Sequence, residues 1–136
     1  MSLTISYTVT MDPQIMPRIN REATRRMLQT GAAIRDKAVA NLAGPRTGRQ
    51  YRIPGTNVMY TASAIGEYPA VRVGALRQSV RMVSVSDTQV VVGTDLLYGM
   101  FLEKKLPQRG GRPWLGRTAA EVEQQIQQIW ARPWNI

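Results

Sequence analysis

The chain has no cysteine and no histidine among its 136 residues, and these two absences remove several chemistries together. Without cysteine there is no thiolate nucleophile and no disulfide, and without histidine the usual general base near neutral pH is missing. Most zinc, haem and iron–sulfur sites also need one of these residue types. Any catalysis would have to use carboxylates, hydroxyls, tyrosine, arginine or lysine. We therefore expect that the protein is not an enzyme and that it has no cofactor and no metal site.

Long apolar runs are missing as well. No window approaches the roughly 18 consecutive apolar residues of a membrane span, and the polar start of the chain has no basic segment ahead of an apolar one. We therefore expect no membrane partner. The 43% apolar content is nevertheless sufficient for a folded core, and the length fits a single domain that spans residues 1–136.

Negative charge is scarce, because 18 basic side chains face nine acidic ones and the net charge is +9. Arginine supplies 15 of the 18, and its planar guanidinium prefers phosphates, carboxylates and aromatic faces. Residues 44–81 carry six basic and one acidic side chain, residues 104–117 carry five and none, and residues 82–103 carry none and three. Two basic loop regions thus flank an acidic segment, which favours contact with acidic neighbours, including copies of the same chain.

The hydrophobic pattern predicts an α+β fold, in which a small antiparallel sheet is packed by one long N-terminal helix and a C-terminal helix. Alternation over residues 3–9 predicts a first strand, and residues 76–85 and 89–94 predict an antiparallel pair. Asp12 is the expected N-cap of the long helix, whose regular part starts near Pro17. Its apolar stripe consists of Ile19, Ala23, Met27, Ile34, Ala38 and Leu42.

Three further features of the helices can be predicted. Arg18, Arg21 and Arg25 share another face of the long helix and are interpreted as a solvated surface. Residues 96–102 predict one or two helical turns that bury apolar side chains, and a Thr118–Glu121 capping box predicts the start of the final helix. The side chains expected to be buried are Leu97, Tyr98 and Phe101 in the short helix, and Val122, Ile126, Ile129 and Trp130 in the final one.

Residues 44–70 predict an exposed hairpin arm or loop insertion. Two segments with modest strand propensity, 49–53 and 58–63, flank the turn-forming quartet Pro54-Gly55-Thr56-Asn57. Few residues in them must be buried, and two strands alone are marginally stable in water. An arm that protrudes from the domain therefore fits these residues better than a hairpin within the core.

Candidate catalytic and phosphate-binding motifs fail on their context. The glycine-rich segment 109–115 has neither the dinucleotide-binding nor the Walker spacing, and no predicted strand leads into it. The carboxylates near loops, Glu67, Asp95 and Glu103, are not paired by spacing, so a carboxylate dyad for hydrolysis is unsupported. Glu103 is interpreted instead as an ion-pair partner of the two lysines that follow it.

A series of short motifs resembles a known family over roughly residues 15–130. In chain order the motifs are Arg46-Thr47-Gly48-Arg49, Ala62-Ser63-Ala64 with Gly66-Glu67 and Pro69-Ala70, Gly74-Ala75-Leu76-Arg77-Gln78-Ser79, Val92-Gly93-Thr94 with Tyr98-Gly99 and Leu102-Glu103, and Arg112-Pro113-Trp114-Leu115. In this respect the chain is similar to the small neck or tail-completion proteins of long-tailed bacteriophages, which are often labelled minor tail components or head–tail joining proteins.

The resemblance implies a structural protein of the virion neck that forms an oligomeric ring, a hexamer or dodecamer, at the head–tail junction. The implied partners are other copies of the chain, the portal-side connector protein and a tail-tube or tail-terminator protein, with non-specific DNA contact in the lumen. The protein would be found in the virion, and in the host cytoplasm before assembly. Our candidate subunit-interface residues are Arg46, Arg49, Arg52, Tyr60, Lys104, Lys105, Arg109, Arg112 and Trp134, the last expected to be exposed.

Two other classes of function stay open on the residues alone. Arg-rich loops are compatible with a nucleic-acid-binding protein, whose affinity would fall steeply with salt. A small basic endoribonuclease toxin can work without histidine through arginine, lysine and tyrosine. No sequence pattern, however, places Tyr51, Tyr60 and Tyr98 with the arginines on one face.

Overall fold

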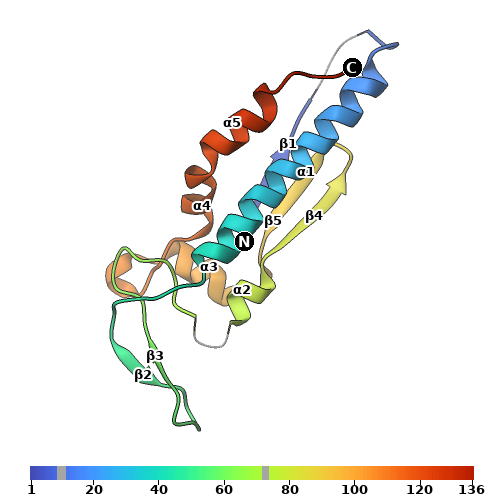
Figure 1. The fold of residues 1–136 in the computed structure, drawn as a ribbon. Coiled ribbons are helices and arrows are strands. Elements are labelled where there is room, and N and C mark those ends of the chain that lie inside the picture. Colours follow the sequence, from blue (N-terminus) through green and yellow to red (C-terminus); the bar gives the residue numbers. More distant parts are fainter. Residues whose placement is uncertain (9–11, 72–73) are drawn as a thin grey trace.

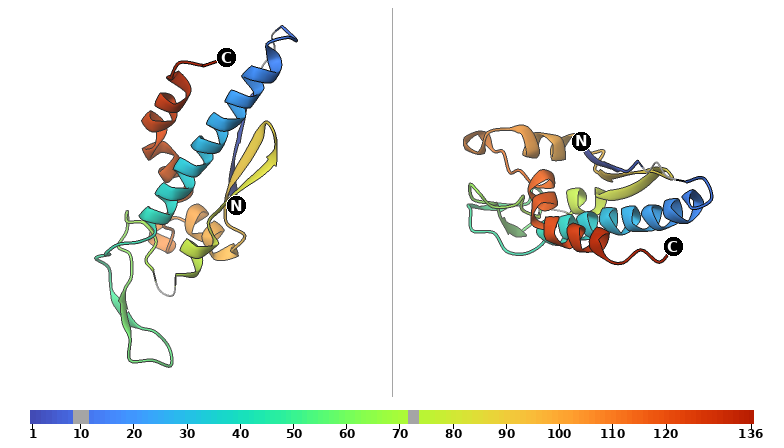
Figure 2. Two further views of the ribbon diagram at one scale, coloured as in Figure 1. Left: turned by 45° about the vertical axis from the view of Figure 1, so that its right-hand side comes forward. Right: turned by 90° about the horizontal axis from the view of Figure 1, so that it is seen from above.

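The computed structural model describes residues 1–8, 12–71 and 74–136. Its main body has three layers: a three-stranded sheet, the long helix α1 (Met16–Asn41), and the helices α4 (Leu115–Glu121) and α5 (Glu123–Ala131) (Figures 1 and 2). The predicted α+β class is confirmed. The two C-terminal helices reach the sheet mainly through α1, against which both of them pack.

The sheet is antiparallel and has the order β1 (Ser2–Ser6), β5 (Gln89–Gly93), β4 (Arg81–Ser86). One face lies on α1, because Val90 and Val92 of the central strand are fully buried there. The outer face is open, with Val83 52% and Val85 58% exposed. The first strand and the last strand of the antiparallel pair overlap the ranges that the alternating pattern predicted. Val9, at the end of the predicted first strand, lies outside the described residues.

Helix α1 buries the predicted stripe, since all six of its apolar residues are at most 4% exposed. The predicted N-cap is wrong. Helix α1 begins at Met16 with Pro17 in its first turn, and the Asp12 carboxylate instead accepts the N–H of Gln14 (2.8 Å) in the preceding turn. Proline has no N–H to donate, so its place in the first turn leaves no additional donor without a partner.

The segment before β4 differs from the prediction. Residues expected to begin a long strand form the short helix α2 (Ala75–Ser79), after which β4 starts at Arg81. Leu76 and Val80 are both buried. Their spacing of four suits one helical turn as well as it suits alternation, so the sequence pattern could not distinguish the two.

Helix α3 (Leu97–Lys104) buries the face opposite to the one predicted. Leu97, Tyr98 and Phe101 are exposed, and the residues that face the body are Gly99 and Leu102. A Cβ atom on Gly99 would lie 2.9 Å from Leu76 and 3.3 Å from the ring of Trp114. Only glycine permits this close approach, and the approach determines which face of α3 is turned outward.

The predicted capping box at Thr118 is also wrong. Helix α4 begins three residues earlier, at Leu115, and the buried Thr118 hydroxyl donates to the Trp114 carbonyl within the helix. The cap comes from α3: the Glu103 carboxylate accepts the N–H groups of Leu115 (2.6 Å) and Trp114 (3.2 Å). Glu103 thus caps a helix, and in the described part of the chain no ion pair joins it to Lys104 or Lys105.

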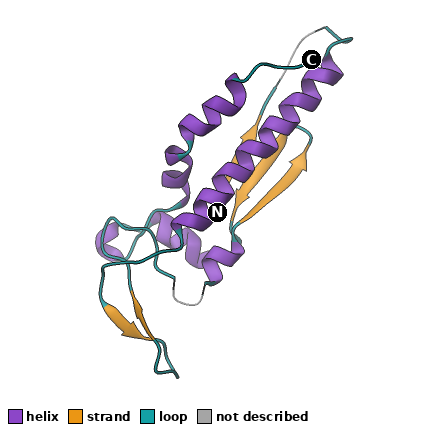
Figure 3. Cartoon of the chain, in the orientation of Figure 1, coloured by secondary structure: helices purple, strands orange, loops and turns teal. Residues whose placement is uncertain are grey.

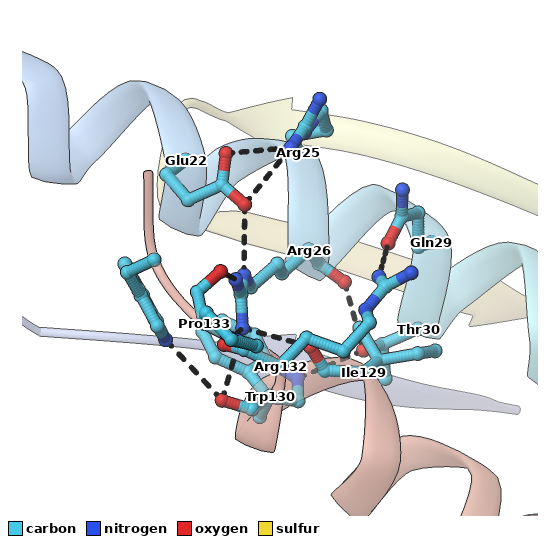
Figure 4. A network of polar contacts seen from close by, with 10 residues as sticks. Glu22, Arg25, Arg26, Gln29, Thr30, Ile129, Trp130, Arg132 and Pro133 are labelled. Atoms are coloured by element: carbon cyan, nitrogen blue, oxygen red, sulfur yellow. Dashed lines mark hydrogen bonds and ion pairs between the residues drawn. The ribbon is translucent and has the colours of Figure 1, made fainter. Parts of the chain in front are cut away.

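The final helix has the predicted inner face, with Val122 buried and Ile126, Ile129 and Trp130 half-buried. Beyond α5 the chain is held against α1 by Arg26, which is only 2% exposed (Figure 4). Its guanidinium donates to four carbonyl oxygens at 2.8–3.0 Å, those of Ile129, Trp130, Arg132 and Pro133. Its Nε also donates to Glu22 at 2.9 Å. We call this group of contacts the Arg26 clamp.

Candidate assembly surface

A two-stranded arm projects from the end of the body where α1 finishes, as Figure 1 and the left view of Figure 2 show. It consists of β2 (Gln50–Arg52) and β3 (Met59–Thr61), which form a sheet of their own (Figure 3). The paired rings of Tyr51 and Tyr60 stack at 5.9 Å between centroids. The turn lies within the predicted quartet, where the Thr56 hydroxyl donates to the Ile53 carbonyl at 2.8 Å. The hairpin is thus inside the range 44–70 assigned to it.

Two of the candidate interface arginines fasten the base of the arm to the body. Arg46 donates to the carbonyls of Asn41 (2.6 Å), Tyr68 (2.8 Å) and Pro69 (3.1 Å). Arg112 donates to the hydroxyl and the carbonyl of Ser63 at 3.0 and 3.1 Å, and also to two carbonyls of its own loop. Most of their donors are therefore used within the chain, a role that charge and spacing alone could not reveal.

A glutamate also joins chain segments at the base of the arm. The Glu67 carboxylate accepts the N–H groups of Ala64 (2.6 Å) and Thr47 (3.0 Å) and the Thr47 hydroxyl (3.0 Å). These backbone hydrogen bonds lower the pKa of Glu67 below its usual value of 4.5. The ionised carboxylate thus joins the two chain segments that enter and leave the arm.

Acid should weaken the hydrogen bonds that Glu67 accepts at the base of the arm. Because the pKa of Glu67 is lowered in the folded protein, its contribution to stability is present above about pH 4.5 and is lost as the pH falls through the folded-state pKa. Hydrogen exchange of the Thr47 and Ala64 amides, corrected for intrinsic rates, should therefore accelerate between about pH 6 and pH 3. E67Q should show fast exchange already at neutral pH, and E123Q, in exposed α5, should not. Equal protection at both pH values would contradict the assignment.

The arm base is also bonded to α4 through Tyr68. Its hydroxyl donates to the Glu121 carboxylate, while the Arg117 guanidinium lies 4.2 Å from the centre of the Tyr68 ring. Burial, together with that hydrogen bond, raises the pKa of Tyr68 to about 12, and the same bond lowers the pKa of Glu121. Tyr68 therefore remains a protonated donor at neutral pH, and the arm base is fixed to the body at several points.

Next to the arm lies a patch of exposed apolar side chains, which we call the α3 patch: Leu97, Tyr98, Phe101 and Leu106, 43–61% exposed. The Lys105 ammonium lies 5.2 Å from the centre of the Phe101 ring. A short 3-10 helix (Pro107–Arg109) follows the patch. Exposed apolar clusters of this kind mark contact surfaces more often than isolated apolar residues do.

A cavity of about 420 Å³ joins the arm base to the α3 patch. Tyr60 and Ala62 line it from the arm, and Tyr98 and Leu102 line it from α3. Arg112 is its only basic lining residue among those that the structure describes, and the hydrogen bonds above already engage that guanidinium. Among the described residues, the lining of the cavity is thus largely apolar.

The structure brings most of the predicted interface residues to one end of the molecule. Arg49 and Arg52 are exposed on the arm, Lys104, Lys105 and Arg109 are exposed after α3, and Tyr60 is half-buried between them. The segment after α5, which contains Trp134, lies at the opposite end of the molecule (Figure 1). Trp134 is half-buried rather than exposed as expected, with its ring 4.4 Å from the Arg26 guanidinium.

The acidic segment predicted to meet the basic loops of a neighbour is partly engaged within the chain. Asp95 pairs with Arg81 at 3.0 Å, and Glu103 caps α4. Asp87 is exposed in the turn between β4 and β5. Apolar contact is therefore a stronger basis than ionic contact for association through this surface.

Neither a metal site nor a membrane-spanning helix is found in residues 1–8, 12–71 and 74–136. No group of three acidic side chains there could hold a metal ion, and none of the helices there is long and apolar enough to cross a membrane. No family model, curated protein or solved structure matches this chain. A function is therefore inferred from the surfaces themselves.

Proposed function

We propose that this protein is a non-enzymatic structural component of a bacteriophage neck, in which identical copies form a ring that joins the connector to the tail and lets DNA pass. The motif order described above supports this class of protein. The observation that carries the proposal is the gathering of exposed apolar surface. Of the twelve most exposed large apolar side chains among the described residues, eight lie on residues 44–70 or in the α3 patch.

These two surfaces are suited to contact between different faces of neighbouring copies. The arm presents Tyr51, Val58 and Met59, which are 44–56% exposed, and the α3 patch presents a second apolar surface at the same end of the body. When one surface binds a different surface on the next copy, repetition of the contact builds a ring if the rotation closes. In the proposed ring, the arm of each subunit covers the α3 patch of its neighbour.

Removing the α3 patch should abolish self-association. We expect L97S/F101S/L106S to raise the dissociation constant between copies by about 100-fold or more, because burial of each such side chain contributes roughly 1.5–3 kcal/mol. The matched control is I15S/V83S/V85S, which removes three comparably exposed apolar side chains elsewhere. Sedimentation velocity over a concentration series measures both variants.

The outcome of this experiment is decisive in either direction. V58S/M59S, on the arm, should weaken association as the patch variant does, because the two surfaces bind each other. Unchanged association of the patch variant, or equal loss in the control, would overturn the proposed contact.

The neck assignment has its own test. Purified protein mixed with tails that lack their neck should form a ring at the head-proximal end of the tail tube, visible by negative-stain electron microscopy. The patch variant should leave the tails bare. Wild-type protein that assembles into rings but does not bind tails would overturn the neck assignment and leave ring formation standing.

A further inference from the structure

Three arginines form a basic stripe on the N-terminal half of α1, at the end of the molecule opposite to the arm (Figure 1). Arg18, Arg21 and Arg25 are all exposed, and spacings of three and four residues place them on one helix face. At 1.5 Å per residue the stripe extends about 10 Å along the helix axis. We call Arg18, Arg21 and Arg25 the basic stripe.

The basic stripe lines one side of a groove of about 450 Å³. The other side is formed by Asn135 and Ile136, at the end of the segment that follows α5. The Arg26 clamp fixes this segment upstream through the carbonyls of Arg132 and Pro133, and Trp134 packs over the clamp. Both sides of the groove therefore exist before any ligand binds, which lowers the entropic cost of binding.

The positive charge of the groove is only partly neutralised. Glu22 is the one acidic side chain that lines the groove among the described residues, and it pairs with Arg25 at 2.8 Å and with the buried Arg26 at 2.9 Å. Figure 4 shows both contacts. Among the described residues, no ion pair involves Arg18 or Arg21. The groove thus contains guanidiniums whose donors are available to an anion.

We propose that the basic stripe binds the phosphate backbone of double-stranded DNA. Several exposed guanidiniums in a row match a regularly charged polyanion, because each can donate two parallel hydrogen bonds to one phosphate. Such contacts position a duplex without reading its sequence. The site differs from the loop arginines that charge counting singled out, of which Arg46 and Arg112 are engaged at the arm base.

This inference does not depend on the proposed neck function. The stripe and the α3 patch lie on different parts of the molecule, so one can fail while the other holds. To keep the two separate, DNA binding is best measured in the background of the L97S/F101S/L106S variant, in which multivalent binding through a ring is removed.

The test uses fluorescence anisotropy of a labelled 20-base-pair duplex over a series of salt concentrations. We expect R18Q/R21Q/R25Q to weaken binding by about tenfold or more at low salt and to reduce the slope of log K against log salt by about 2 to 3, one unit for each lost phosphate contact. The control R35Q/K37Q/R81Q removes the same number of charges from exposed positions outside the groove and should change affinity by less than about twofold.

Three results would overturn the proposal. The first is equal loss of affinity in the control, which would mean that net charge alone attracts DNA. The second is no binding by the protein with an intact stripe at about 50 mM salt, where phosphate contacts are strong. The third is equally effective competition by a poly-glutamate peptide of matched charge, which would identify an acidic protein surface as the ligand. Circular dichroism of each variant confirms that the fold is retained.

Discussion

Replacing Arg26 with alanine should lower the free energy of unfolding by about 3–5 kcal/mol, the loss typical when one partner of a buried charged network is removed. The side chain is 2% exposed and donates to five acceptors. Ile129 and Trp130 belong to the last turn of α5, whose carbonyls have no partner within the helix. Arg26 therefore serves as the C-terminal cap of α5 from a position about 100 residues earlier in the chain.

Two variants separate the clamp from a general effect of charge. R25A removes a neighbouring arginine whose side chain is 65% exposed, and its ion pair with Glu22 should contribute less than about 1 kcal/mol. R26K keeps the charge but cannot reach the same set of carbonyls, so it should recover only part of the lost stability.

Urea unfolding followed by circular dichroism measures all three variants, and hydrogen exchange should show the R26A effect first in α5. If the free energy of unfolding of R26A were within about 1 kcal/mol of the wild-type value, water would be satisfying the carbonyls that Arg26 binds.

The buried position of Arg26 could have been found in the sequence, although its role could not. Position 26 lies three residues after Ala23 and four before Thr30, both of which are buried, so helical periodicity alone places it beside the predicted stripe. We interpreted Arg18, Arg21 and Arg25 as a solvated surface, because charged residues usually are solvated, and made no prediction for Arg26. The carbonyls that Arg26 binds lie at the other end of the chain, and no local pattern points to them.

The two incorrect helix predictions in the C-terminal half share one physical cause. Both the outward face of α3 and the start of α4 are determined by contacts between the helices, namely the close packing at Gly99 and the cap donated by Glu103. The local sequence pattern favoured burial of the larger side chains of α3 and a capping box at Thr118–Glu121. Tertiary contacts overrode both preferences, because a glycine face permits closer packing and a carboxylate from α3 was already available.

The arm was predictable because its signals are local. A turn quartet between two short strand-forming segments specifies a hairpin without reference to the remainder of the chain. The roles of the arginines in and beside the arm were not predictable from the sequence. Arg46 and Arg112 bind nearby backbone carbonyls, whereas Arg49 and Arg52 are exposed. Charge density therefore could not distinguish the guanidiniums that are engaged within the chain from those that remain exposed.

Trp114 should be the second residue whose loss is severe, and its loss should affect assembly as well as stability. The ring is fully buried, and its Nε1–H donates to the Gly99 carbonyl at 3.0 Å, so this side chain holds α3 against the body. W114A should lower the free energy of unfolding by about 3–5 kcal/mol, the usual range for removing a large aromatic side chain from a core. W114F keeps most of the packing but leaves the carbonyl without its donor, so its cost should be about 1–3 kcal/mol.

The informative measurement is made where W114F is still folded. Because Trp114 is buried and lies outside the α3 patch, any weakening of self-association in W114F must act through the orientation of α3. We expect sedimentation velocity to show weaker association of W114F, at a temperature where circular dichroism confirms that the protein is folded. W130F, which alters a half-buried tryptophan on α5 at the other end of the body, should associate as wild type does. Normal association of W114F together with reduced stability would contradict this expectation and show that the α3 patch keeps its binding geometry without the hydrogen bond from Trp114.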